Sequence, residues 1–182
     1  MIVLRPYRDT DYPAATRLWR RVFGGLKAED ERARLRQTGA RNPGLFLLAE
    51  EGGRLVGTAF GTSDGRRGFL YHVAVAAGAR RRGVGRLLVR EIERRLWALG
   101  VGVIHLRVDG VNRGAIAFYG SLGFTADPPV VGMRRTLPQA AIAGPAGRGT
   151  SLQTAITGPA GRRSTRGRRG GNSRPRERRA AR

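Results

Sequence analysis

The residue types best suited to binding chemistry gather in one short segment, Arg-Arg-Arg-Gly-Val-Gly at positions 80–85. An apolar run at 69–75 precedes the segment and has the length of a buried strand. After it, apolar residues recur at helical spacing, at Val84, Leu88, Ile92, Leu96 and Leu99. The first N–H groups of a helix lack partners and carry partial positive charge, and glycines let an anion approach the backbone closely. The segment therefore predicts a site for phosphate, and a pyrophosphate is the expected ligand.

Single positions exclude two common nucleotide-binding loops. A P-loop ends in Gly-Lys-Ser/Thr, whereas the only lysine of the chain is Lys27. A dinucleotide-binding loop needs a third glycine three residues after Gly85, and Leu88 stands there. The pattern that fits is Arg-x-x-Gly-x-Gly.

A second motif follows downstream. Residues 101–108 are typical of another buried strand, and Asn112 is suited to cap the helix after it. Tyr119 comes seven residues after Asn112, and Leu-Gly-Phe follows at 122–124. With these two motifs at this separation, residues 1–137 resemble the GNAT superfamily of acetyl-coenzyme A-dependent N-acetyltransferases, and among them the bacterial YpeA-like members.

The resemblance implies an α/β (α+β) fold, in which helices flank a mixed central sheet of six to seven strands. Local patterns predict strands at 2–6, 45–50, 54–62, 69–75, 101–108, 124–126 and 131–137. They also predict helices that start near Pro13, cover 28–37, follow the phosphate loop and follow Asn112.

The resemblance also assigns roles to individual residues. The coenzyme A pyrophosphate would be bound by Arg80, Arg81, Arg82, Gly83, Val84, Gly85 and Arg86, and the pantetheine arm by Val73, Ala74 and Val75. In the family two parallel strands splay apart at this place, so the backbone N–H of Val75 would polarise the thioester carbonyl. Asn112 would contact the coenzyme or serve only as a helix cap, and the two valines would pack in the core in either case.

Tyr119 is the expected general acid, because a phenol is protonated at neutral pH and can donate to the departing thiolate. The alternative is a tyrosine that only fills the core. The general base is not evident. Arg107 stands where some relatives carry a glutamate, and Phe69 and Tyr71 stand where others carry glutamate or histidine. The remaining candidates are weaker: ordered water, Glu50, Asp109, and His72, which strand alternation would turn to the face opposite Phe69 and Tyr71.

Composition limits the kinds of site and the cellular location that can be expected for this chain. The net charge is +22, of which residues 1–137 carry +12 and residues 138–182 carry +10. The chain has no cysteine, which excludes disulfides, thiolate metal sites and a cysteine nucleophile, and no metal is expected. No apolar run approaches the length of a membrane span, so we expect a soluble, cytoplasmic protein without membrane contact.

A single folded domain followed by a tail is expected, with residues 1–137 as the N-acetyltransferase domain. Residues 138–182 carry few large apolar side chains, contain the related segments 141–148 and 155–162, and end in a run of Arg, Gly and Ser. We expect this tail to be disordered. It would bind polyanions weakly and without sequence preference, since it has no aromatic residue for stacking, or it would only keep the protein soluble.

Two other functions compete with acetyl transfer to an amine: a catalytically silent acyl-coenzyme A-binding module, and a nucleic-acid-associated protein that acts through the tail. The sequence leaves the acceptor open between small molecules, protein N-termini and lysines, and it leaves the oligomeric state open.

Truncation after Leu137 is expected to leave folding and acetyl-coenzyme A binding unchanged and to remove most salt-sensitive binding to polyanions. Each phosphate contact contributes a log–log salt slope of about −0.9 on duplex DNA, so titrations at low and physiological salt measure the effect. Polyanion binding that survives truncation undiminished, or a truncated chain that no longer folds, would contradict the assignment.

Overall fold

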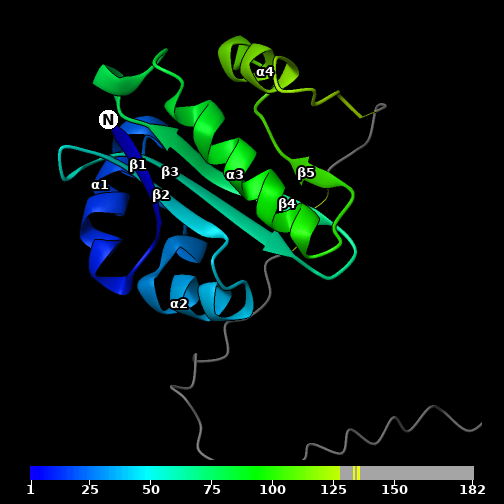
Figure 1. Cartoon of the computed structure of the whole chain (residues 1–182), viewed down its shortest axis with the longest axis horizontal. Helices are drawn as coiled ribbons and strands as arrows, with labels where there is room; N and C mark the ends of the chain where they lie inside the picture. Colours follow the sequence, from blue (N-terminus) through cyan, green and yellow to red (C-terminus); the bar gives the residue numbers. More distant parts are fainter. Residues whose placement is uncertain (128–132, 134, 136–182) are drawn as a thin grey trace, which may run out of the picture. The chain divides into compact units, whose positions relative to one another are not determined.

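A five-stranded mixed sheet forms the centre of the described chain, which comprises residues 1–127 with Met133 and Arg135 in this computed structural model (Figure 1). The strands lie side by side in sequence order: β1 (Ile2–Pro6), β2 (Phe46–Glu51), β3 (Arg54–Ser63), β4 (Gly68–Val75) and β5 (Ile104–Leu106). The first four strands are antiparallel, and β5 runs parallel to β4. A tight turn joins β2 to β3, with Gly52 at φ 55° and Gly53 at φ 73°, as primed hairpin turns require.

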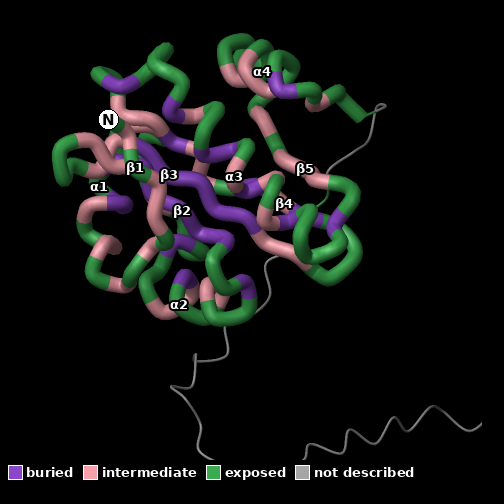
Figure 2. The backbone as a smooth tube through the Cα atoms, in the orientation of Figure 1, coloured by how far each residue is buried: buried purple, intermediate pink, exposed green. Residues whose placement is uncertain are grey.

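Helices cover both faces of this sheet and create a core on each side. Helices α1 (Tyr12–Phe23) and α2 (Arg32–Arg41) cover one face, where Trp19 is completely buried against Phe46. Helix α3 (Val84–Ala98) covers the other face with its buried leucines and isoleucine, and α4 (Arg113–Gly120) follows β5. Figure 2 shows β2 and β3 as the most continuously buried strands, between the two layers. No helix of the described residues is long and apolar enough to cross a membrane.

Close packing of α3 depends on three glycines beneath it. A Cβ on Gly57 would lie 3.0 Å from side-chain atoms of Leu88 and Val84. On Gly61 it would lie 2.8 Å from Ile92, and on Gly68 2.8 Å from Leu96. The separations at Gly61 and Gly68 are shorter than real carbon–carbon contacts, and the one at Gly57 is at the tight end of their range. A side chain at these positions would therefore push the helix outward. The glycines therefore set the height of α3 above the sheet.

Most predicted elements are present, and the differences have local causes. The helix expected at 28–37 is a 3₁₀ turn (Ala28–Asp30) followed by α2, because Glu31 adopts an extended ψ of 138°. The strand expected at 101–108 is reduced to β5, since the N–H of Val101 still bonds to the carbonyl of Leu96 at the end of α3. Leu99, expected on the buried stripe, lies at the helix end and is 62% exposed.

The sheet has five strands in the described part rather than six or seven. Residues 124–126 are not in a strand. The strand expected at 131–137 lies almost entirely outside the described residues, and the tail at 138–182 lies wholly outside them.

Replacing Gly61 by alanine is expected to lower the free energy of unfolding by about 1–3 kcal/mol, because the new Cβ displaces Ile92 and hence α3. Gly102→Ala is the matched control, since a Cβ there has no neighbour within 4 Å. Denaturant unfolding measures both variants. Equal stabilities would show that α3 does not depend on the missing side chain.

Candidate active site

The pairing of β4 with β5 ends early, and the region between the strands beyond the last pair, Leu70 with Leu106, is called the notch below. The two strands pair only at their beginnings, through Gly68 with Ile104, Phe69 with His105 and Leu70 with Leu106. From residue 71 onward β4 continues without β5. The N–H of Ala76 donates to the carbonyl of Val56 on β3, so the N–H of the preceding Val75 points the other way, into the notch. A backbone donor is thus available where two parallel strands diverge.

The three residues expected along the pantetheine arm differ in the directions of their side chains and backbone groups. Val73 and Val75 place their side chains against the α3-side core. Ala74 is paired with Thr58 of β3 and is 1% exposed in the α1-side core. The backbone groups of Ala74 therefore face β3, whereas those of Val75 face the notch.

The loop before α3 presents backbone N–H groups at the end of β4. Gly83 caps the helix with φ 82°, a left-handed conformation that favours glycine, and a Cβ there would meet open space. The first helical hydrogen bond runs from the N–H of Leu87 to the carbonyl of Gly83. The N–H groups of Val84, Gly85 and Arg86 precede it and lack helical partners. This geometry suits an anion.

Gly85 also has a packing role that the sequence did not predict. A Cβ on Gly85 would lie 3.2 Å from Cζ of Phe118 on α4. The absent side chain therefore makes room for α4 against the start of α3.

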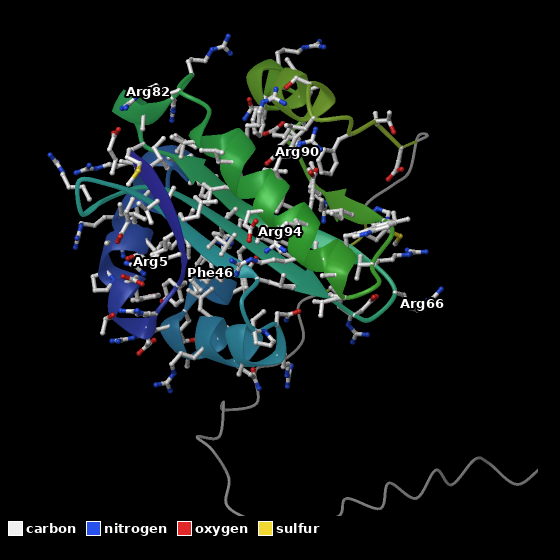
Figure 3. All side chains as sticks on the ribbon, in the orientation of Figure 1. Arg5, Phe46, Arg66, Arg82, Arg90 and Arg94 are labelled. Atoms are coloured by element: carbon white, nitrogen blue, oxygen red, sulfur yellow. The ribbon has the colours of Figure 1, made fainter. Side chains whose placement is uncertain are left out.

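Three arginines of the loop have protein partners. Arg82 binds Glu51 through two hydrogen bonds, one of 2.9 Å, and Figure 3 shows it at the molecular edge before α3. Arg80 donates from Nε to the carbonyl of Val75, and Arg86 donates to Oγ of Ser121 at 3.1 Å. Arg81, with φ 61°, makes no side-chain hydrogen bond within the described residues. Such exposed contacts are weak, so the arginines could leave these partners and bind an anion instead.

Asn112 and Tyr119 lie on α4. The Oδ1 of Asn112 accepts a hydrogen bond from the N–H of Ala115 at 3.0 Å, which confirms the helix cap. The ring of Tyr119 packs edge-on against Phe118 and Phe124, at centroid distances of 5.0 and 5.7 Å. Burial raises the pKa of Tyr119 to about 12. The phenol therefore stays protonated at neutral pH.

The sequence placed His72 on the wrong face of β4. Thr58 and Phe60 of β3 pair with Ala74 and Tyr71, so β4 carries an extra residue in a bulge. His72 has φ 50° in this bulge. Its ring consequently packs against Trp19 of α1 at 4.3 Å. Tyr71 pairs with Phe60 of the α1-side core, so the two residues lie on the same side of the sheet. Alternation with a period of two fails at a bulge.

A hydrogen-bonded network fixes this histidine. Nε2 of His72 lies 2.8 Å from Oδ1 of Asp30, in the 3₁₀ turn between α1 and α2. The carbonyl of His72 accepts from Oγ1 of Thr58, which itself accepts from Nε1 of Trp19 at 3.0 Å. Burial lowers the pKa of His72, although the neighbouring Asp30 acts in the opposite direction. The imidazole is therefore neutral at neutral pH.

The other candidate bases are engaged in structural contacts. Glu50 pairs with Arg5 at 2.6 Å. Oδ1 of Asp109 accepts from the N–H of Val111 at 3.1 Å, in the turn before α4.

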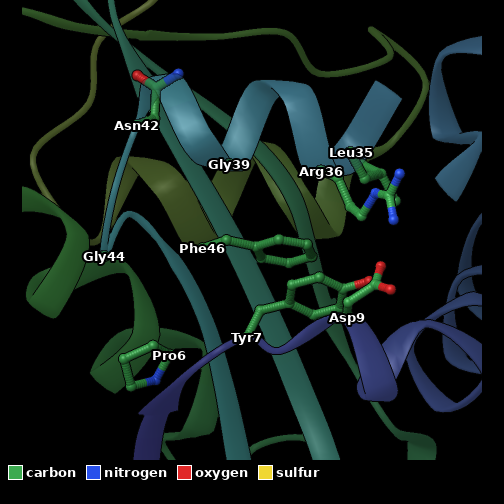
Figure 4. A pocket seen from close by; sticks show the side chains of 9 residues that line it. All are labelled: Pro6, Tyr7, Asp9, Leu35, Arg36, Gly39, Asn42, Gly44 and Phe46. Carbon is green, nitrogen blue, oxygen red and sulfur yellow. The ribbon is translucent and has the colours of Figure 1, made fainter. Parts of the chain in front are cut away.

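A separate pocket of about 200 Å³ contains none of the expected site residues. It lies between the end of β1, the start of β2 and α2, where the rings of Tyr7 and Phe46 stack at 4.3 Å (Figure 4). Burial raises the pKa of Tyr7 to about 12.

Comparison with known proteins identifies the relatives of this chain. Residues 12–124 match the model of the acetyltransferase (GNAT) family. An acetyltransferase of Pectobacterium atrosepticum is 33% identical over 132 residues, which cover 72% of this chain and 94% of that protein.

Two solved structures share the fold. The ribosomal-protein-S18-alanine N-acetyltransferase of Escherichia coli has a TM-score of 0.58 and 24% identity, over 70% of this chain and 80% of that one. AAC(6')-Iy in complex with the bisubstrate analogue CoA-S-monomethyl-acetylneamine has a TM-score of 0.61 and 18% identity, over 75% of this chain and 99% of that one. From the family match and the Pectobacterium relative, this chain belongs to the GNAT family of acetyltransferases.

Proposed function

We propose that this protein is an acetyl-coenzyme A-dependent N-acetyltransferase, in which a primary amine attacks the thioester directly in a ternary complex. The observation that carries the proposal is the notch between β4 and β5, with the N-terminus of α3 at its end. Among the residues that the structure describes, the edge of β4 offers one N–H without a strand partner and the start of α3 offers three without helical partners. These donors suit a thioester carbonyl and a pyrophosphate respectively.

The coenzyme would lie along this notch. Its pyrophosphate would accept from the N–H groups at the start of α3 and attract Arg81, while Arg80, Arg82 and Arg86 would add positive charge. Its pantetheine arm would follow the unpaired edge of β4, so that the N–H of Val75 donates to the thioester oxygen. The coenzyme A-based analogue bound to AAC(6')-Iy supports this choice of co-substrate.

Tyr119 would supply the proton to the departing thiolate. A pKa of about 12 keeps the proton on the phenol, yet it also makes the phenol a weak acid. Transfer is favourable only when the thiolate forms in the same water-poor environment, because burial raises the basicity of both anions. Tyr119 is thus suited to donate its proton to the thiolate rather than to water.

The acceptor is a primary amine, on a small molecule or on a protein N-terminus or lysine. A screen with neamine, a peptide that begins with alanine, and spermidine samples these classes, and free thiol release from acetyl-coenzyme A measures turnover. Binding of acetyl-coenzyme A without thiol release across the screen would favour the silent binding module.

Exchange of Gly83 for aspartate is expected to weaken acetyl-coenzyme A binding about tenfold or more, or ~1.4 kcal/mol, because it places a negative charge against the pyrophosphate. Gly83→Asn is the matched control, since asparagine has the same shape and both residues tolerate a positive φ. Calorimetry measures the two affinities. Equal affinities would place the pyrophosphate elsewhere.

Tyr119→Phe is expected to lower kcat by about 10²- to 10⁴-fold and to leave acetyl-coenzyme A affinity unchanged, since only the proton donor is lost. Tyr7→Phe is the control, because it removes an equally shifted phenol at the separate pocket. Thiol release per folded molecule distinguishes the two variants. If Tyr119→Phe loses stability and keeps its rate, the ring serves only the core.

A further inference from the structure

Three aromatic rings lie on the α1-side face of the sheet at the point where β4 and β5 separate. Phe69 and His105 are register partners on the two strands, and their ring centroids are 5.6 Å apart. Tyr71, two residues further along β4, stacks beside Phe69 at 6.3 Å and is 46% exposed. Tyr71 pairs with Phe60 of the α1-side core, which places all three rings on that face. These three residues are called the ring surface below.

Arg107 comes directly after β5, at the register position opposite Tyr71. Pairing with β4 ends at Leu106, so Tyr71 and Arg107 are the first residues of the two strands that no longer pair. Leu106 and Val108 are partly buried and Arg107 between them is exposed, so the alternation of sides continues past the end of the strand. Arg107 therefore lies on the side of His105. Its guanidinium makes no hydrogen bond or ion pair with any residue that the structure describes.

An acceptor amine would reach the notch from this same face. The opposite face is filled by the α3-side core, in which the side chains of Val75 and Tyr119 pack. On β3, Phe60 pairs with Tyr71 and Gly57 pairs with Val75. These two β3 residues are three positions apart, which corresponds to ~10 Å along the strand. A molecule of the size of phenylalanine can therefore bridge the ring surface and a thioester held at Val75.

Charge limits which amines suit this site. Among residues 1–127, the glutamates other than Glu29 pair with arginines. The aspartates other than Asp127 bind arginine, His72 or the N–H groups of turns. One carboxylate remains beside the ring surface, because Oδ2 of Asp127 lies 3.9 Å from Nδ1 of His105. A single carboxylate matches one ammonium group, whereas a polyamine or an aminoglycoside carries several.

We propose that the acceptor is a free amino acid with an aromatic side chain, whose ring lies on the ring surface and whose carboxylate binds Arg107. The inference rests on the N-acetyltransferase function proposed above and names its acceptor. A guanidinium presents two parallel donors that match the two oxygens of a carboxylate. Aromatic rings add stacked or edge-on contacts to the area that they bury.

The reaction balances with this acceptor. The nitrogen of the amino acid forms a C–N bond to the acetyl carbon, and the C–S bond of the thioester breaks. The ammonium nitrogen loses two protons in all, of which one ends on the coenzyme A sulfur and the other in water. The products are the N-acetyl amino acid, free coenzyme A and one proton, and the carboxylate stays bound to Arg107 throughout.

L-Phenylalanine is expected to exceed L-phenylalaninamide in kcat/KM by about tenfold or more, because only the free amino acid offers a carboxylate to Arg107. The amide has the less basic amine and hence more of the reactive neutral form, so intrinsic reactivity opposes the expected order. L-Alanine keeps the carboxylate and lacks the ring, and it should also fall below phenylalanine by about tenfold or more. Thiol release from acetyl-coenzyme A measures all three amines.

Arg107→Gln is expected to lower the ratio of kcat/KM for phenylalanine over phenylalaninamide by about 10- to 100-fold, because the charged partner of the carboxylate is lost. Arg66→Gln is the matched control. Arg66 is an exposed arginine in the connection between β3 and β4, at the end of β4 opposite to Val75 (Figure 3). The control should keep the ratio of the wild type.

Tyr71→Ala tests the ring surface separately. It is expected to lower the preference for phenylalanine over alanine by about tenfold, because the acceptor ring loses its stacking partner. The preference for phenylalanine over phenylalaninamide should persist, since Arg107 is unchanged. Circular dichroism establishes that each variant is folded before its rates are compared.

The outcomes separate this inference from the function on which it rests. Equal or better use of phenylalaninamide by the wild type, or turnover confined to neamine, spermidine or the alanine peptide, would overturn the inference and leave the N-acetyltransferase function standing. An unchanged ratio in folded Arg107→Gln would do the same. Binding of acetyl-coenzyme A without thiol release from any of these amines would count against the proposed function itself.

Discussion

Helix α3 packs closely on a strip of the sheet formed by glycines, and this packing fixes the positions of the other parts of the proposed site. Gly57, Gly61 and Gly68 remove the side chains that would hold the helix away, so Leu88, Ile92 and Leu96 reach the backbone of β3 and β4. The start of α3 is thereby fixed beside the end of β4. A Cβ on Gly85 would lie 3.6 Å from Cγ2 of Val75. The first N–H groups of α3 and the edge of β4 beyond Leu70 are therefore close enough to belong to the one site proposed above.

The opposite face of β4 follows a different constraint. A non-glycine residue at φ 50° costs about 1–3 kcal/mol, and His72 tolerates this only because its surroundings hold it. Its ring lies on Trp19, its carbonyl accepts from Thr58, and its Nε2 binds Asp30. A strained backbone that three elements support is typical of sites where the orientation of a side chain is kept at a cost in folding stability.

The loop before α3 and the Asn112 cap could be predicted because their signals are local: glycine, a following apolar period and a short side chain before a helix. The face occupied by His72 could not, because one extra residue in β4 reverses the alternation and only the pairing with β3 reveals it. The role of Gly85 was also hidden, since Phe118 reaches it from a helix remote in sequence. The glycines under α3 were visible in the sequence, but nothing local marks them as facing a helix.

The contact between Gly85 and Phe118 limits how this sequence can vary during evolution. Gly85 belongs to the helix start that is proposed to bind the pyrophosphate, and Phe118 adjoins Tyr119. The contact therefore couples the two halves of the proposed site. A larger residue at one position would displace the other half unless the second residue became smaller. Relatives that keep this geometry should therefore show compensating changes in side-chain volume at these two positions.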